Sequence, residues 1–327
     1  MLGLRVRLFL LTAFMFAIIY AVIAVIGSRL GISNFYFYLI FALVIMSIQY
    51  MLGPKIVDWS MRVRYIKPGE YPKIEGMVRN LAAAAKIPMP RIGIAQVAIP
   101  NAFAYGRTVR DARVCVTEGI LKLLDDKEMR AVLGHEMSHI KNRDVLTITL
   151  LSVIPMILYR IAWQFLFFGS GRRDRGQNAA LVGLVAFGFY FVTNLLVLYA
   201  SRIREYFADK GSVDLGNDPS SLASALYKLV YGSARVDRAA LKDVEGMKAF
   251  FANDPSKAAM ELKDLRDLDL DKSGTISRDE LMRLQARQIK LGLGDKMMEL
   301  LSTHPNMLKR IKRLSEWSPS QMARKAN

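Results

Sequence analysis

The segment DDKEMRAVLGHEMSHIKN, residues 125–142, predicts a helix that carries chemistry. Its first turn is acidic, which is typical of a helix start because carboxylates are favourable near the helix N-terminus. The spacing of His135 and His139 places both imidazoles on one helical face. Two ligands of one tetrahedral zinc ion require that geometry. Glu136 follows the first histidine and is placed to act as a general base.

A hydrolytic zinc site needs a third protein ligand and an open position. No third histidine follows HEMSH at close spacing, so we expect a carboxylate on another helix. The segment SRIREYFAD, residues 201–209, offers Glu205 and Asp209, which share one helical face. Glu205 could bind the metal, and Asp209 could orient one of the two histidines through its free ring N–H. A charged helix face beside a membrane is the competing interpretation.

Four apolar runs indicate an integral membrane protein. Hydrophobic residues make up 52% of the 327 residues, and each run has about the 20 residues that cross a bilayer core. The runs form two hairpins, although Pro155, Arg160 and Gln164 interrupt the third run, so the second hairpin could dip instead of span. A single cysteine, Cys115, excludes a disulfide scaffold. The runs are Leu8–Ile26, Phe35–Leu52, Val145–Phe168 and Ala179–Ala200.

The formal net charge of +17 is explained by basic residues that flank these runs. The lipid bilayer is therefore an expected partner, and nucleic acid is not, because no nucleic-acid motif accompanies the charge. The positive-inside rule places the N-terminus and everything after Leu52 in the cytoplasm, at the cell (plasma or inner) membrane. Arg172, Arg173 and Arg175 in the turn of the second hairpin oppose full spanning.

The predicted fold class is a mainly α integral membrane protein with an α+β peptidase domain. The two polar blocks flank the second hairpin, so they lie on the same side of the membrane and can form one domain. The first block predicts a helix followed by three strands. The expected helix is Tyr71–Lys86, and the expected strands are Arg91–Val97, Asn101–Gly106 and Arg113–Thr117. The expected regions are 1–52 and 145–200 in the membrane, and 53–144 and 201–327 in the peptidase domain.

Several motifs together resemble the HtpX-type membrane zinc endopeptidases. These are HEMSH, the hairpin after it, SRIREYFAD, STHPNMLKRIKRL at residues 302–314, and NAFAYG at residues 101–106. That family consists of gluzincins related to the CAAX prenyl endopeptidases, and the likeness runs from about Leu8 to Leu314. The resemblance implies a gluzincin-type domain with one zinc ion per chain. It implies His135, His139 and Glu205 as ligands, Glu136 as the base and Asp209 as a supporting residue.

The third histidine of the chain, His304, lies in the segment STHP. In the related enzymes a histidine in this position lies near the active site, where it could donate a hydrogen bond to the oxyanion. The competing interpretation is a helix N-terminus capped by Ser302 or Thr303, with Pro305 in the first turn.

The segment NAFAYG has two interpretations that we hold equally. An edge strand beside the zinc helix could pair its backbone with an extended substrate. The candidate residues for that contact are Asn101, Ala102, Phe103 and Ala104. Alternatively, the segment is a turn into the next strand.

The segment DLDKSGTISRDE, residues 269–280, departs from the family pattern because it matches a twelve-residue EF-hand loop. Helices are expected on both sides, so the EF-hand-like part spans about 256–290. The competing interpretation is a helix–turn–helix that binds calcium weakly. A calcium ion here could gate access to the zinc site. The candidate ligands are Asp269, Asp271, Ser273, Thr275 and Glu280.

These features predict a membrane-anchored zinc-dependent endopeptidase with polypeptide substrates. The resemblance implies that these substrates are misfolded or damaged membrane proteins, as in protein quality control. Two alternatives stay open. One is a site-specific processing protease of the CAAX-endopeptidase type, and the other is a catalytically inactive, calcium-responsive membrane scaffold.

Overall fold

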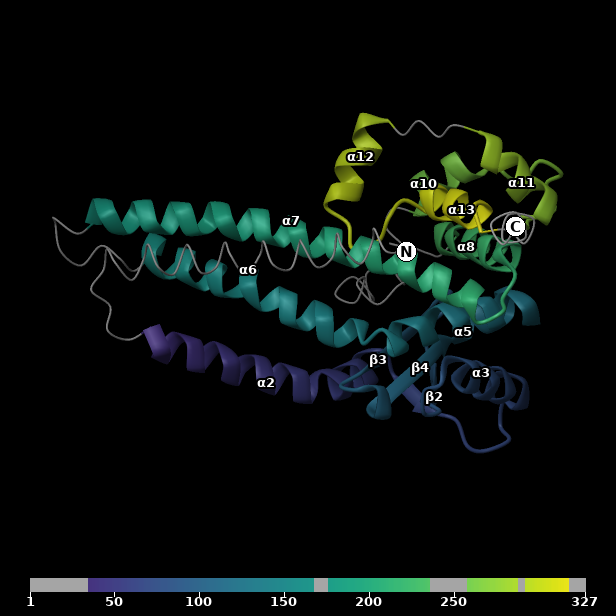
Figure 1. Cartoon of the computed structure of the whole chain (residues 1–327), viewed down its shortest axis with the longest axis horizontal. Helices are drawn as coiled ribbons and strands as arrows, with labels where there is room; N and C mark the ends of the chain where they lie inside the picture. Colours follow the sequence, from purple (N-terminus) through teal and green to yellow (C-terminus); the bar gives the residue numbers. More distant parts are fainter. Residues whose placement is uncertain (1–34, 168–175, 236–257, 288–291, 318–327) are drawn as a thin grey trace, which may run out of the picture. The chain divides into compact units, whose positions relative to one another are not determined.

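The computed structural model describes residues 35–167, 176–235, 258–287 and 292–317, which are mostly helical (Figure 1). These residues fall into two compact units. The first holds the described residues up to Leu52 together with Leu146–Ile203, and the second holds Gly53–Val145 and the described residues from Arg204 onward. The predicted run Leu8–Ile26 and most of the turn between the third and fourth runs lie outside the described residues.

Two helices in the described part of the chain are long and apolar enough to cross a membrane, over Asp144–Leu166 and Ala180–Asp214. They belong to α6 (Asp144–Phe167) and α7 (Gly176–Asp214), which lie side by side (Figure 1). Buried apolar side chains from both helices pack together, namely Leu151, Ile154, Leu158, Val197 and Ala200. The α7 helix continues well beyond the apolar run that predicted it, so SRIREYFAD lies on the same helix as the fourth run.

The predicted run Phe35–Leu52 forms the first part of α2 (Phe35–Ser60), which is helical throughout. Its role as a membrane span stays a prediction, and so does the number of hairpins.

The second unit contains a four-stranded sheet in the order β1-β2-β4-β3. Strand β2 runs parallel to β4, and the other two neighbouring pairs are antiparallel. The three predicted strands are confirmed with small shifts at their ends, and the short β1 was not predicted. The strands are β1 (Val63–Tyr65), β2 (Arg91–Ala95), β3 (Ala102–Gly106) and β4 (Ala112–Thr117).

Each strand sends alternate side chains to opposite faces of the sheet. On β4, Val114 and Val116 join the main core, which also contains α3 (Pro72–Ala85), α5 (Asp126–Lys141) and α8 (Pro219–Ala234). Cys115, between the two valines, joins a smaller core on the other face. That smaller core also holds Val57, Met61, Ile99, Phe103 and Tyr105.

The start of α5 is fixed by a capping box. The Asp125 carboxylate accepts hydrogen bonds from the backbone N–H groups of Lys127 and Glu128 at 2.8 and 2.9 Å, and Glu128 accepts one from the Asp125 N–H at 3.0 Å. Glu128 also accepts hydrogen bonds from Ser224 at 2.6 Å and Lys228 at 2.8 Å on α8. The helix that bears HEMSH is therefore capped and tied to a neighbouring helix at its first turn.

The remaining helical segments of the second unit are short. They are η1 (Val109–Asp111), α4 (Glu118–Leu123), α10 (Ala258–Leu265), α11 (Arg278–Ala286), α12 (Leu293–Leu300) and α13 (Met307–Ser315). Helix α10 precedes the segment DLDKSGTISRDE and α11 begins within it, at Arg278, so that helices lie before and after the loop as the sequence predicted.

Candidate metal centre

Helices α5 and α7 approach each other closely because glycines lie where they cross. A Cβ atom on Gly211 of α7 would overlap the side chain of Ser138 on α5, and one on Gly134 of α5 would lie 2.9 Å from the Ser212 hydroxyl of α7. Ser212 donates a hydrogen bond to the backbone oxygen of Ala131 at 2.6 Å across the same crossing. The absence of side chains at these positions brings the two helices close enough to share one site.

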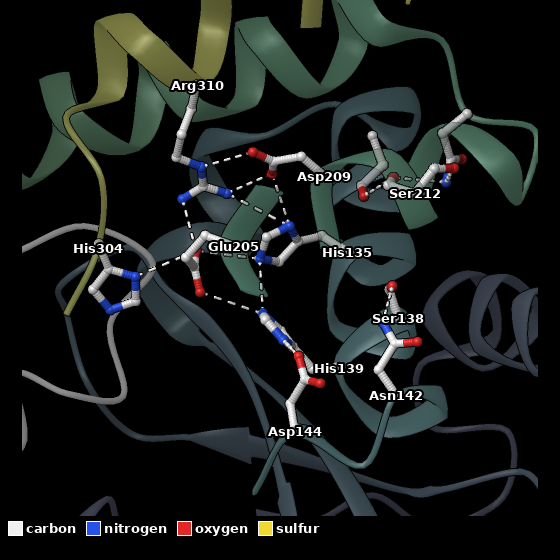
Figure 2. A network of polar contacts seen from close by, with 12 residues as sticks. His135, Ser138, His139, Asn142, Asp144, Glu205, Asp209, Ser212, His304 and Arg310 are labelled. Carbon is white, nitrogen blue, oxygen red and sulfur yellow. Dashed lines mark hydrogen bonds and ion pairs between the residues drawn. The ribbon is translucent and has the colours of Figure 1, made fainter. Parts of the chain in front are cut away.

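The crossing brings His135, His139 and Glu205 together (Figure 2). The two Nε2 atoms are 3.1 Å apart. The Glu205 oxygens lie 3.7 Å from His135 Nε2 and 3.5 Å from His139 Nε2. Ligand atoms bonded tetrahedrally to one zinc ion are about 3.3 Å apart, given bonds of about 2.0 Å. The three separations are close to that value.

The other nitrogen of each imidazole faces a carboxylate. His135 Nδ1 lies 2.9 Å from Asp209 Oδ1, and His139 Nδ1 lies 2.5 Å from Asp144 Oδ2. If both Nδ1 atoms carry the proton that these carboxylates accept, both Nε2 atoms present lone pairs to each other. Two facing lone pairs repel unless a cation lies between them, so the residues present fit a bound zinc ion.

Arg310 on α13 supplies positive charge to the buried carboxylates. Its side chain is fully buried and donates two hydrogen bonds to Asp209, at 2.9 and 2.6 Å. Its third nitrogen, Nη1, lies 3.0 Å from Glu205 Oε2. Because both carboxylates are buried, this guanidinium offsets the cost of keeping them charged.

Glu136 is buried beside the two histidines on α5. Burial raises the pKa of the Glu136 carboxyl, and the neighbouring histidines partly oppose that rise. The backbone N–H of Ala104 on β3 also hydrogen-bonds to this carboxylate. A raised pKa makes a carboxylate a better proton acceptor.

Strand β3, which holds most of the predicted substrate contacts, is an edge of the sheet as described. Asn101, just before it, pairs with Thr117, because its carbonyl accepts the Thr117 N–H at 2.9 Å. Backbone groups in an antiparallel pair alternate in direction, so those of Ala102 and Ala104 point away from β4 toward the free edge. Phe103 instead packs in the smaller core.

His304 lies before α13, with Nδ1 3.3 Å from Glu205 Oε2. The helix begins at Met307, and the Asn306 side chain caps it by accepting the Leu308 N–H at 2.9 Å. The interpretation of Ser302 or Thr303 as the helix cap is therefore wrong, because Asn306 takes that place and Pro305 precedes the cap. The structure brings His304 to the same cluster as the metal-ligand candidates (Figure 2).

Of the two carboxylate contacts to the histidines, one settles an alternative that the sequence left open and the other was not predicted. Asp209 contacts His135, whereas the sequence left open which histidine it would orient. The carboxylate at His139 belongs to Asp144, which the sequence analysis did not consider. Asp144 lies five residues after His139, beyond the end of α5, so helical spacing could not reveal the contact.

The EF-hand-like loop forms a separate acidic cluster, in which Asp269, Asp271 and Glu280 each place one oxygen within 4.8 Å of the others. The loop's own backbone binds these oxygens. Glu280 accepts hydrogen bonds from the N–H groups of Leu270 at 2.6 Å and Ser277 at 2.9 Å. Asp269 accepts the N–H groups of Ser273 and Gly274, both at 2.9 Å. The hydroxyls of Ser273 and Thr275 contact each other at 2.9 Å.

Comparisons with known proteins agree on one family. The model of peptidase family M48 matches residues 68–318, more than half of the chain. A protease HtpX homolog from Methanothermobacter thermautotrophicus is 50% identical over 227 residues, which cover 69% of this chain and 86% of that protein. Protease HtpX homolog 2 from Methanosarcina mazei is 34% identical over 318 residues, which cover 96% of this chain and 95% of that protein.

A solved structure, that of S. mikatae Ste24p, is a more distant neighbour. The aligned residues cover 96% of this chain and 67% of the Ste24p chain, with a TM-score of 0.48 and 14% sequence identity. At that distance the likeness carries no argument about function.

Proposed function

The chain belongs to peptidase family M48 and is a metallopeptidase of the HtpX type, and we propose that it is a membrane-anchored zinc endopeptidase. The observation that carries the proposal is the convergence of His135, His139 and Glu205 at ligand separations, with Glu136 on the same helix. These three residues would hold the zinc ion, which would supply a Lewis acid for the scissile carbonyl and for a water molecule.

Residues of the chain would carry out proton transfer, stabilise the oxyanion and orient the metal ligands. Glu136 accepts a proton from the attacking water and passes it to the leaving amine, a role that the raised pKa of its carboxyl supports. His304 lies beside Glu205, where it can donate a hydrogen bond to the oxyanion. Arg310 and Asp209 keep His135 in its orientation.

The substrate binds as an extended chain along β3. The outward backbone groups of Ala102 and the outward carbonyl of Ala104 offer hydrogen bonds to an added strand, while the Ala104 N–H contacts Glu136. Such pairing reads the backbone and little side-chain sequence, so it suits unfolded polypeptides. Misfolded or damaged membrane proteins are the substrates that we propose.

The proposed location is the cell membrane, with two hairpins and a cytoplasmic catalytic domain. The two apolar helices among the described residues support membrane anchoring. The basic residues beside the first two runs support a cytoplasmic face.

The test is a cleavage time course on casein, an unfolded protein. The full chain is purified in detergent under chelation to limit self-cleavage, and zinc is then added back. We expect cleavage that requires zinc and is lost in Glu136→Gln, while zinc still binds at one ion per chain. Cleavage of one defined peptide with casein untouched would favour a site-specific processing protease. Zinc binding without any cleavage would favour an inactive scaffold.

We propose separately that the loop from Asp269 to Glu280 binds calcium, because its three carboxylates converge at the loop positions where calcium ligands are needed. Calorimetric titration of the zinc-loaded chain with calcium tests this, with Glu280→Gln as the comparison. We expect one binding event that the substitution abolishes. Proteolysis at the same rate with and without calcium would exclude a gating role for the loop.

A further inference from the structure

Asp144 and Arg204 form a buried ion pair beside the candidate metal centre. Asp144 is the first residue of α6, and Arg204 precedes Glu205 on α7. Their exposed fractions are 8% and 4%. A buried pair carries a desolvation cost that a surface pair avoids, so its place beside the histidines calls for an explanation.

The two oxygens of Asp144 contact different partners. One faces Arg204. The other lies 2.5 Å from His139 Nδ1 (Figure 2). A carboxylate that accepts the Nδ1 proton fixes the ring tautomer and leaves the Nε2 lone pair free. That lone pair faces His135 Nε2 and Glu205.

We infer that Asp144, held in place by Arg204, is a positioning residue that prepares His139 to bind zinc. The inference rests on the zinc site proposed above, and it concerns how the ligand is held rather than what the enzyme cleaves.

The same arrangement surrounds the other histidine. His135 Nδ1 faces Asp209, and Asp209 is held by Arg310. Each imidazole therefore has its own carboxylate, and each carboxylate has its own arginine, although the residues come from different elements. Arg310 also contacts Glu205, the carboxylate that faces both Nε2 atoms.

The competing explanation for Asp144 is its place in the first turn of α6, where a carboxylate is favourable in any helix. Asp126 is a matched control for that effect. It is the first residue of α5 and pairs on the surface with Lys73 at 2.8 Å, and that pair involves no histidine. Only a positioning role makes the two aspartates differ in their effect on zinc.

The test measures the zinc dissociation constant of the full chain in detergent, by competition with a chromophoric chelator. We expect Asp144→Asn and Arg204→Met to weaken zinc binding about 10- to 100-fold. Arg204→Lys should recover most of the affinity, because it keeps a positive charge beside Asp144. Asp126→Asn should bind zinc as the unmodified chain does.

A second measurement reports directly which nitrogen of the His139 ring carries the proton. Nitrogen NMR of metal-free protein labelled at its three histidines reports the tautomer of each ring. At a pH where the rings are neutral, we expect His139 to carry its proton on Nδ1 in the unmodified chain and to become a tautomer mixture in Asp144→Ala. A helix-start role alone would leave the tautomer unchanged.

The inference is overturned if Asp144→Asn and Asp144→Ala both bind zinc as tightly as the unmodified chain, or if Asp126→Asn weakens binding equally. Thermal unfolding in chelator checks that each variant folds. If the Asp144 variants do not fold, equal zinc affinity of Arg204→Met and Arg204→Lys overturns it instead. Tight zinc binding without proteolysis defeats the proposed function and leaves this inference standing, whereas no zinc binding by the unmodified chain overturns both.

Discussion

The two acidic clusters of the second unit hold their carboxylates in opposite ways. Around Glu205, the neighbours are side chains from α5, α13 and the segment before α13, far apart in sequence. Around Glu280, the donors are backbone N–H groups and a serine from within the same twelve-residue loop. The first cluster exists only when the whole unit is folded, and the second is largely assembled by local sequence.

This contrast separates preparation for a metal from local capping. In the histidine cluster, two lone-pair nitrogens face each other and carboxylates bind the outer nitrogens, so a cation completes the arrangement. In the loop, Ser277 and Glu280 form a capping box for α11 that is satisfied without an ion. We therefore expect metal loss to affect the first cluster much more than the second.

The largest expected effect is that of Glu205→Ala. The change removes the ligand that both histidines face, so zinc should fall from about one ion per chain to none. Loss of several kcal/mol of transition-state stabilisation lowers the cleavage rate about a thousandfold or more. Metal analysis and casein cleavage measure both. Glu280→Ala is the matched change in the loop, and a comparable loss of zinc there would contradict the separation of the two clusters.

The next effect concerns the arginines of the two regions. Arg310→Met leaves the buried carboxylates of Asp209 and Glu205 without their guanidinium, which should lower the free energy of unfolding by about 3–5 kcal/mol. Arg278→Met breaks a pair between the loop and Asp218 in which the arginine is exposed, and because solvent screens such a pair the loss should be far smaller. Denaturant unfolding of both variants under the same detergent conditions gives the two values. Equal losses would mean that burial does not distinguish the regions.

A smaller effect tests the crossing of α5 and α7. Gly211→Ala places a methyl group against Ser138, and overpacking of this kind costs about 1–3 kcal/mol. Because Glu205 lies on the same helix, zinc affinity should fall as well. Gly76→Ala on α3 meets open space and should instead stabilise the chain by about 0.5–1 kcal/mol. If Gly211→Ala behaves like Gly76→Ala, the helices do not depend on that contact.

The same contrast explains what could be predicted from the sequence. The strands from Arg91 onward and the helix that bears HEMSH follow local periodicity, and they were predicted almost to their ends. The resemblance supplied Glu205 as the partner of that helix. The contact from Asp144 to His139 and the close approach at Gly211 depend on where the chain turns after α5 and on how α7 crosses it. No local pattern encodes these features, and β1, with three residues, is too short for alternation to mark it.

The smallest effect is expected from calcium at the loop. Its carboxylates already accept backbone hydrogen bonds, so an ion adds to a formed structure instead of creating one. Calcium at about ten times its dissociation constant would raise the free energy of unfolding by about 1.4 kcal/mol. The shift should vanish in Glu280→Gln, which keeps the side-chain shape and removes one of three converging charges. Zinc affinity should be the same in both proteins, because among the residues that the structure describes no ion pair or hydrogen bond joins the loop to the histidines. An equal calcium shift in both proteins would show that the ion binds outside the loop.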